Sequence, residues 1–149
     1  MREIYGNLWD YDGKPDTVVC ITTNGFVKAN GLAVMGRGCA FEATLKYPAI
    51  QKRLGDCIKA RGNNLCWLNT KLVAFPVKHA WWQDADLELI KKSAEQLARE
   101  ARNLPHFLFV LPRPGCGNGR LQWPAVRAIL FDVLPDNVAI IPHGLAYKD

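Results

Sequence analysis

Two glycine-dense segments constrain most strongly what this chain can fold into. The first runs from Asn24 to Gly38 and the second from Pro114 to Gly119, and each lies between an apolar, strand-like run and a stretch of helical composition. Glycine allows positive φ angles and a close approach of the backbone to a ligand, and a loop that opens a helix presents N–H groups to an anion. Either loop alone is compatible with an ordinary tight turn, but two such loops predict a diphosphate site.

The order of the remaining segments predicts an α/β domain. Apolar and β-branched runs indicate strands, and amphipathic stretches between them indicate helices. The expected strands lie at residues 3–9, 17–22, 65–68, 72–75, 107–111 and 138–141. The expected helices lie at residues 40–46, 48–61, 84–103 and 123–133. Strands that alternate with helices are typical of a layered domain with a largely parallel sheet.

Length and composition favour a single domain that covers residues 1–149. A chain of 149 residues, 49% of them hydrophobic, can bury its own core. Its longest apolar run, residues 107–111, is far shorter than the roughly 20 residues that cross a bilayer. The first residues lack the apolar stretch of a secretory signal, so we expect a cytoplasmic protein, and we expect a monomer. The formal net charge of +5 favours phosphate-bearing partners and leaves nucleic acid open as one of them.

Cysteine and histidine spacing predicts neither a metal site nor a disulfide framework. The five cysteines are an odd number and form no C-x-x-C pair, so we expect reduced thiols. His79, His106 and His143 lack metal-ligand spacing with any cysteine or acidic cluster. We therefore expect no bound metal and no cofactor.

Neither glycine loop fits a common nucleotide-binding fingerprint. The second loop lacks the Lys-Ser/Thr pair of a P-loop, and neither loop has G-x-G-x-x-G spacing followed by a ribose-binding acid. These absences weaken the interpretation of the chain as a kinase or a dehydrogenase.

Four blocks of the sequence carry a family resemblance. The blocks are Gly6–Trp9, Thr23–Gly25, Val34–Ala40 and Pro112–Trp123. They resemble the macrodomains, which bind ADP-ribose, and in particular the branch that contains terminal ADP-ribose protein glycohydrolase and the DNA ADP-ribosyl glycohydrolase antitoxins. Within that branch V-M-G-[KR]-G-x-A and G-C-G-x-x-x-L-x-W are specific in combination. The resemblance runs from about Tyr5 to Ile141 and implies a three-layer α/β/α sandwich with a mixed, largely parallel central sheet.

The resemblance implies an ADP-ribose site around the two glycine loops. The implied ligand-binding residues are Asn7, Leu8, Asn24, Met35, Gly36, Arg37, Gly38, Pro114, Gly115, Cys116, Gly117, Asn118, Gly119 and Arg120. Asn7 and Leu8 stand where macrodomains have an acid and an aliphatic residue that meet the adenine, and the amide keeps an uncharged acceptor for the adenine amino group. Asn24 stands where the family has an asparagine beside the distal ribose, with Asn30 as a rival.

The same resemblance makes Lys78 the expected catalytic residue. Lys78 follows an apolar run and precedes His79-Ala80-Trp81-Trp82, which is similar to the catalytic-lysine segment of this branch. An amine near the anomeric carbon C1″ can attack that carbon or stabilise the opening sugar when burial or a nearby cation lowers its pKa. The alternative is a solvent-exposed lysine at a strand end, and Lys71 is the nearest competitor. We place Trp81 or Trp82 at the rim of the site.

The resulting functional hypothesis is an ADP-ribosyl glycohydrolase that removes ADP-ribose from DNA or protein by lysine-assisted attack at C1″. The protein-directed members of the branch carry an aspartate in the second loop, whereas this chain has Asn118, as the DNA-directed antitoxins do. Three alternatives stay open: a non-catalytic ADP-ribose-binding module, an ADP-ribose 1″-phosphate phosphatase, and a basic nucleic-acid-binding protein that uses the domain as a scaffold.

Overall fold

The computed structural model describes residues 1–142. Its strands are β1 (Arg2–Glu3), β2 (Thr17–Asn24), β3 (Cys66–Asn69), β4 (Leu72–Lys78), β5 (Leu108–Pro112) and β6 (Val138–Ile141). Its helices are the 3₁₀ helix η1 (Leu8–Tyr11) and the α-helices α1 (Gly38–Lys46), α2 (Ile50–Arg61), α3 (Leu87–Asn103) and α4 (Trp123–Val133).

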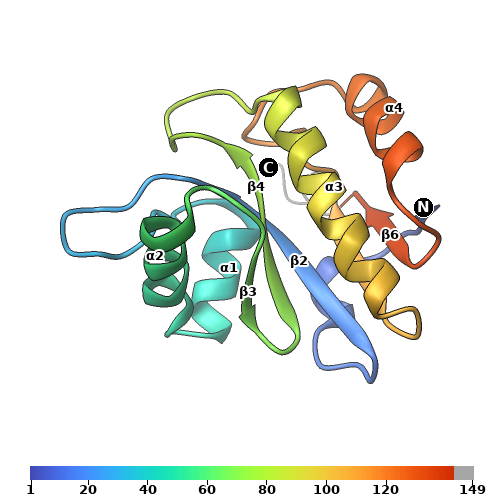
Figure 1. Cartoon of the computed structure of the whole chain (residues 1–149), viewed down its shortest axis with the longest axis horizontal. Coiled ribbons are helices and arrows are strands. Elements are labelled where there is room, and N and C mark those ends of the chain that lie inside the picture. The colour runs from blue at the N-terminus through green and yellow to red at the C-terminus, as the bar shows by residue number, and fades with distance from the viewer. Residues whose placement is uncertain (143–149) are drawn as a thin grey trace.

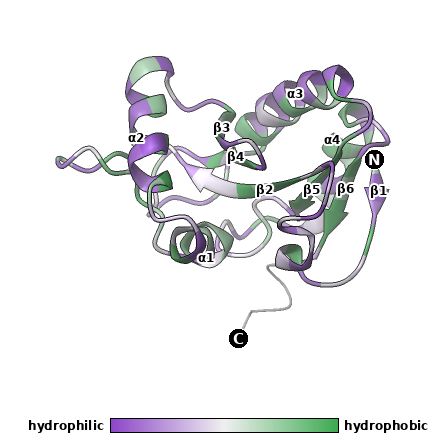
Figure 2. Cartoon of the chain, turned by 90° about the horizontal axis from the view of Figure 1, so that it is seen from below, coloured by the Kyte–Doolittle hydropathy of each residue, from purple (hydrophilic) through white to green (hydrophobic). Residues whose placement is uncertain are grey.

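The strands form one sheet between two helical layers. The strand order is β1-β6-β5-β2-β4-β3, in which only the β3–β4 pairing is antiparallel within the described residues. Figure 2 shows α3 and α4 on one face of the sheet and α1 and α2 on the other. The expected three-layer α/β/α sandwich with a mixed, largely parallel sheet is therefore confirmed.

The chain changes direction across the sheet at β2. After β2 it passes through α1, α2 and β3 to β4 on one side, and α3 then carries it across to β5 on the other side (Figure 1). In open α/β sheets, ligands bind beyond the carboxyl ends of the strands at such a switch point. The topology therefore indicates where to look for a site before any side chain is considered.

Alternate residues of β2 belong to two separate cores. Val18 and Cys20 pack with residues of α3 and α4, whereas Val19 and Ile21 pack with residues of α1 and α2. Successive side chains of a strand point to opposite faces, and both faces of this sheet are covered. This double coverage explains why residues 18–21 of β2 form an unbroken apolar run rather than an alternating pattern.

The expected strand at residues 3–9 is wrong for most of its length. Strand β1 ends at Glu3, and the chain then forms η1 from Leu8. Gly6 has a φ of +116°, which breaks an extended conformation. Asn7 caps η1 by accepting a hydrogen bond from the Trp9 N–H at 3.0 Å, while the Asp10 carboxylate accepts one from the Asn7 N–H at 3.4 Å. A local capping box thus overrides the β propensity of the run.

The expectation that all thiols are reduced is also wrong, because the structure pairs Cys57 with Cys66 in a disulfide. Cys57 lies on α2 and Cys66 begins β3, and both belong to the same buried cluster. The packing of α2 against β3 brings the two sulfurs together. The two cysteines are nine residues apart and form no recognisable sequence motif, so the pairing could not be predicted from the sequence. Among residues 1–142, Cys20, Cys39 and Cys116 are free.

The described residues contain neither a membrane-spanning helix nor a cluster of metal-ligating side chains. No helix there is long and apolar enough to cross a membrane. No cluster of three or more His, Cys, Asp or Glu residues suited to a metal ion was found in the same part of the chain. His143, one of the three histidines considered above, lies outside the described residues.

Candidate functional site

A cavity of about 720 Å³ lies at the carboxyl ends of β2, β4 and β5. These strands are parallel neighbours, so their ends meet at one edge of the sheet, and the loops that follow them wall the cavity. The residues that line it are Thr22, Thr23, Asn24, Val34, Met35, Gly36, Arg37, Gly38, Cys39, Ala40, Glu42, Val77, Lys78, Trp81, Pro112, Arg113, Gly115, Cys116, Gly117, Asn118 and Gly119.

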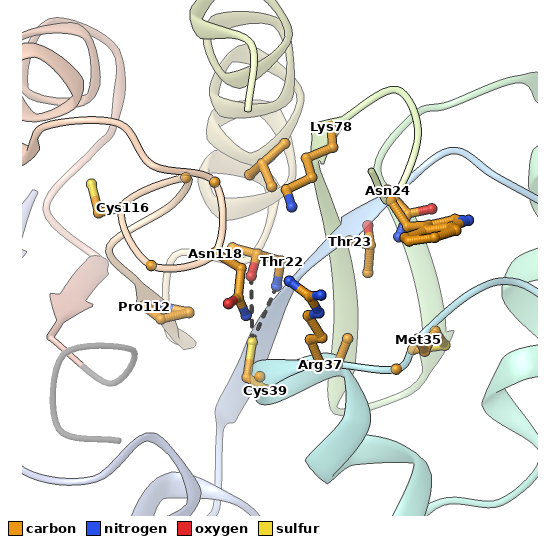
Figure 3. Close-up of a pocket in the computed structure, with 18 of the residues that line it drawn as sticks. Thr22, Thr23, Asn24, Met35, Arg37, Cys39, Lys78, Pro112, Cys116 and Asn118 are labelled. Carbon is orange, nitrogen blue, oxygen red and sulfur yellow. Dashed lines mark hydrogen bonds between the residues drawn. The ribbon is translucent and has the colours of Figure 1, made fainter. Parts of the chain in front are cut away.

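The two glycine loops lie side by side in this cavity. A Cβ atom built on Gly38 would lie 3.5 Å from Nδ2 of Asn118, so the first loop contacts the second directly. Figure 3 shows Asn118 across from Arg37 at the same opening. Helix α1 begins at Gly38 without a side-chain cap from Arg37. Its first N–H groups therefore suit an anion between the loops.

The glycines of these loops fall into two groups, those that the fold requires and those that it does not. A Cβ on Gly119 would lie 2.6 Å from the carbonyl oxygen of Gly115, and a Cβ on Gly115 would lie 2.8 Å from the Ile90 side chain. Gly119 is therefore required by the close approach of the loop to its own backbone at Gly115, and Gly115, which has a φ of +75°, is required by packing of the loop against α3. By contrast, a Cβ on Gly36 or on Gly117 would meet nothing within 4 Å, and neither residue has a positive φ. The fold itself gives no reason for these two glycines, and both line the cavity.

Lys78 is the last residue of β4, and the residue is only 9% exposed. The Lys78 carbonyl oxygen accepts hydrogen bonds from the Gly25 N–H at 3.1 Å and from Asn63 Nδ2 at 2.9 Å, which anchors the strand end. Its amine points into the space between the loops, toward the guanidinium of Arg37 (Figure 3). Within residues 1–142 that amine has no hydrogen-bond or ion-pair partner.

The surroundings of Lys78 lower its pKa below the usual lysine range. Burial is the main cause, because it disfavours the ammonium form, and the positive charge of Arg37 acts in the same direction. Asp84 opposes the shift and Arg120 adds to it. A reactive lysine was expected to need burial or a nearby cation, and Lys78 has both.

Polar groups on the cavity floor come from β2 and the start of α1. The Thr23 hydroxyl is buried and has no hydrogen-bond partner among the described residues. Thr22 donates its N–H to the Cys39 sulfur at 3.4 Å, as the dashed line in Figure 3 marks. A buried hydroxyl without a protein partner calls for a ligand atom or a water molecule.

The two cysteines of the cavity are poorly suited to nucleophilic chemistry. Burial raises the pKa of the Cys39 thiol, with only partial compensation from its hydrogen bonds to Thr22. Burial likewise raises the pKa of Cys116 to about 11. Because the thiolate is the reactive form, both residues stay unreactive near neutral pH.

The structure brings most of the expected site residues together. Eleven of them line the cavity: Asn24, Met35, Gly36, Arg37, Gly38, Lys78, Gly115, Cys116, Gly117, Asn118 and Gly119. Asn24 also fastens the first loop, because its Nδ2 donates to the Val34 carbonyl oxygen at 3.0 Å. Its rival Asn30 is exposed and lies away from the cavity, as does the exposed Lys71, the competitor of Lys78.

Four expected site residues lie outside the cavity lining. Leu8 is fully buried in the core, so its side chain does not face the cavity, and the Asn7 side chain caps η1. Pro114 is buried within its loop. Arg120 lines a separate hollow of about 280 Å³ and lies 3.8 Å from Asp84 in an exposed ion pair. These positions depend on local backbone geometry that the motif alone does not define.

Several residues that line the cavity were not expected from the sequence. Thr22 and Thr23 lie within a strand that is mostly apolar. Their position at the end of that strand, directly before Asn24, could have indicated that they line the cavity. Glu42 was hidden inside a helix, although it lies four residues after Gly38 and hence on the same helix face. Arg113 directly follows β5 and stacks over the Trp123 ring at 4.8 Å.

The segment after Lys78 forms part of the rim. Trp81 lines the cavity and is 46% exposed, whereas the 59% exposed Trp82 packs edge-on against Phe26 with ring centroids 5.3 Å apart. His79 pairs with Asp86, the N-cap of α3, at 2.7 Å. His79 therefore fastens this segment to α3.

The fold is that of a macrodomain. The macrodomain of Mycobacterium tuberculosis DarG is 26% identical to this chain, with a TM-score of 0.74 over 93% of this chain and 95% of that one. The macrodomain of Thermus aquaticus DarG is 23% identical, with a TM-score of 0.67 over 94% and 95% of the two chains. Thermosipho africanus DarTG, solved in complex with ADP-ribose, is 17% identical, with a TM-score of 0.72 over 95% of this chain and 41% of that longer chain. The macrodomain resemblance expected from the sequence is confirmed at the level of fold.

Comparisons by sequence gave no match. No family model matches the chain, and no curated protein matches it.

Proposed function

We propose that this protein binds ADP-ribose and hydrolyses the bond between its distal ribose and a macromolecule. The observation that carries the proposal is the buried residue Lys78, whose amine points between two adjacent glycine loops in one cavity. The ADP-ribose complex of Thermosipho africanus DarTG, which shares the fold, supports this choice of ligand. Two arginines, Arg37 and Arg113, line the same cavity and suit a diphosphate.

The glycine loops hold the diphosphate and orient the distal ribose. The N–H groups at the start of α1 and the loop around Gly117 donate to phosphate oxygens, and Arg37 supplies the countercharge. In this arrangement C1″ of the distal ribose faces Lys78. Holding both reactants in one geometry removes much of the entropic barrier to their reaction.

Lys78 then acts as the nucleophile. The neutral amine forms a bond to C1″ while the bond between C1″ and the acceptor breaks, and the acceptor leaves with that electron pair and takes up the proton released by the amine. Water next attacks C1″ of the lysine adduct and restores the amine, which releases free ADP-ribose. The second loop carries Asn118 and no acid, so the proposal assigns no general base there.

The direct test is release of ADP-ribose from modified macromolecules. The protein is incubated with ADP-ribosylated DNA and, separately, with ADP-ribosylated protein, and free ADP-ribose is measured over time. We expect release from at least one of them, with DNA favoured because the chain has a formal net charge of +5. Absence of release from both, with an active glycohydrolase as the positive control, contradicts the proposal.

The pH dependence of release tests the role of the Lys78 amine. Only the neutral amine attacks, so kcat/KM should rise with pH around a midpoint below the usual lysine pKa of about 10.4. Asp84 raises the pKa of Lys78, so Asp84→Asn should move the midpoint to lower pH. Arg120 lowers that pKa, so Arg120→Gln should move the midpoint to higher pH. Neither side chain lines the cavity. If neither substitution shifts the midpoint, the group that titrates is not the Lys78 amine.

Asn118 favours a second candidate function, a module that binds ADP-ribose without cleaving it. An amide in place of a loop acid removes one means of activating water. Calorimetry with free ADP-ribose, combined with the release assay, separates the two functions. A binding module gives a saturable heat of binding but releases no ADP-ribose from the modified macromolecules.

A further inference from the structure

The end of β4 that carries Lys78 extends beyond its antiparallel partner. Strand β3 pairs with β4 from Leu72 to Ala74, so the remaining residues of β4 lie beyond that pairing. On the other side β2 accompanies β4 to its end, but the register shifts between Thr23 and Asn24. A strand end without a complete ladder needs other hydrogen bonds for its backbone groups. The partners of its last carbonyl groups therefore determine where Lys78 lies.

Groups outside the sheet bind the carbonyl oxygens of this strand end. The Pro76 carbonyl oxygen accepts a hydrogen bond from the Ser93 hydroxyl at 2.7 Å. The Val77 carbonyl oxygen accepts one from the Asp86 N–H at 2.9 Å. Ser93 lies on α3 and Asp86 is the N-cap of that helix, so these two bonds tie β4 to α3. The carbonyl oxygen of Lys78 takes its donors from another part of the chain.

Asn63 supplies one of those donors from the loop between α2 and β3. Its Nδ2 lies 2.9 Å from the Lys78 carbonyl oxygen, and the Gly25 N–H donates to the same oxygen at 3.1 Å. The Asn63 amide packs closely over Gly25, because a Cβ built on this glycine would lie 2.7 Å from Asn63 Cγ and from Asn63 Nδ2. Gly25 has no positive φ, so a glycine is required here to make room for the Asn63 amide.

The loop that carries Asn63 is itself held in place. Gln96 of α3 donates its Nε2 to Asn64 Oδ1 at 2.9 Å. The Cys57–Cys66 disulfide links the helix before the loop to the strand after it. These contacts fix the loop to α2, α3 and β3, so the Asn63 side chain reaches the end of β4 from a fixed position.

We propose that Asn63 is a positioning residue, which places the Lys78 amine in the cavity by holding the Lys78 carbonyl oxygen. The consequence for catalysis rests on the proposed function, because that function requires the amine at C1″. Displacement of a reacting group by about 1 Å can slow a reaction by about 100-fold. Asn63 lies outside the cavity lining, so it acts on the reaction through Lys78 and not through contact with the ligand.

The test compares Asn63→Ala with Asn64→Ala, a substitution of the same kind at the next residue of the loop. Asn64 also makes hydrogen bonds, but its partners are Gln96 and the Arg61 carbonyl oxygen. In Asn63→Ala we expect kcat for release of ADP-ribose to fall by about tenfold or more, while the affinity for ADP-ribose stays within about twofold of wild type. Asn64→Ala should leave both quantities within about twofold of wild type, even if its melting temperature falls further.

The titration of the Lys78 amine provides a second readout, which does not require turnover. The rate of acylation of Lys78 by acetic anhydride, measured by peptide mass spectrometry over a range of pH, gives the pKa of the amine, because only the neutral form reacts. Burial lowers this pKa, so loosening the strand end in Asn63→Ala should raise it toward the usual value of about 10.4. The charged groups that act on the amine, Arg37, Asp84 and Arg120, are unchanged in both variants. The control variant should keep the wild-type pKa.

The two readouts separate this proposal from the proposed function. If Asn63→Ala keeps the wild-type kcat or the wild-type pKa of Lys78, or if Asn64→Ala reproduces its effects, the proposal is overturned and Asn63 serves only the stability of the loop. If the wild type releases no ADP-ribose, the proposed function fails, and the acylation profile alone determines whether Asn63 holds Lys78. Asn63→Leu, which keeps the branched shape but has no donor, is the second variant should Asn63→Ala unfold, and it should show the same changes.

Discussion

Lys78→Ala should abolish release of ADP-ribose while ADP-ribose still binds. The amine at the end of β4 is the group we assign to attack at C1″, and its removal takes away the nucleophile but leaves both glycine loops in place. We expect the rate constant of release to fall by about 10³-fold or more and the affinity for ADP-ribose to change by less than about tenfold. Single-turnover release and calorimetry on the same preparation measure the two quantities.

The control for this prediction is Lys71→Ala. Lys71 precedes β4, is exposed and lies outside the cavity, so its removal should leave turnover unchanged. Lys78→Arg adds a sharper comparison, because a guanidinium keeps the positive charge but supplies no neutral amine. If Lys78→Ala or Lys78→Arg still turns over at the wild-type rate, the chemistry belongs to another group.

The sequence predicts those parts of the site that are local in the chain. Gly36, Gly38 and the glycines of residues 115–119 follow strands and precede helices, and parallel strands bring their carboxyl ends to one edge of the sheet. Lys78 could be found in the same way, since it closes an apolar run. The lowering of its pKa could not be predicted, because burial and the approach of Arg37 arise only when α1 packs on the sheet.

The parts that sequence analysis missed depend on contacts between distant segments. Glu42 enters the cavity because α1 is oriented by the sheet, and Trp9 reaches it across 33 positions of sequence. The Cys57–Cys66 disulfide likewise follows from the packing of α2 on β3. The turn at Gly6 is a different case, because its signal was local: a glycine followed by Asn7 and, three residues later, Asp10 forms a capping box that was outweighed by the aliphatic residues around it.

Gly117→Val should prevent ADP-ribose from binding without destabilising the protein. A Cβ on Gly117 meets nothing within 4 Å, and the residue has no positive φ, so the fold tolerates a side chain there. The same side chain would occupy the space that we assign to the diphosphate. We expect the affinity for ADP-ribose to fall by about 100-fold or more, which corresponds to roughly 2.7 kcal/mol, while the melting temperature stays within about 2 °C of wild type.

Gly119→Ala provides the matched opposite case within the same loop. Its Cβ would lie 2.6 Å from the Gly115 carbonyl oxygen and 2.7 Å from the Ala85 Cβ, so this substitution should cost about 1–3 kcal/mol of stability through overpacking. A calorimetric titration and a thermal melt of each variant separate the two effects.

Full ADP-ribose affinity in Gly117→Val would mean that the ligand does not approach this loop, and the diphosphate would then have to lie elsewhere in the cavity. Loss of stability in Gly117→Val comparable to that of Gly119→Ala would instead mean that this glycine serves the fold, as Gly115 and Gly119 do.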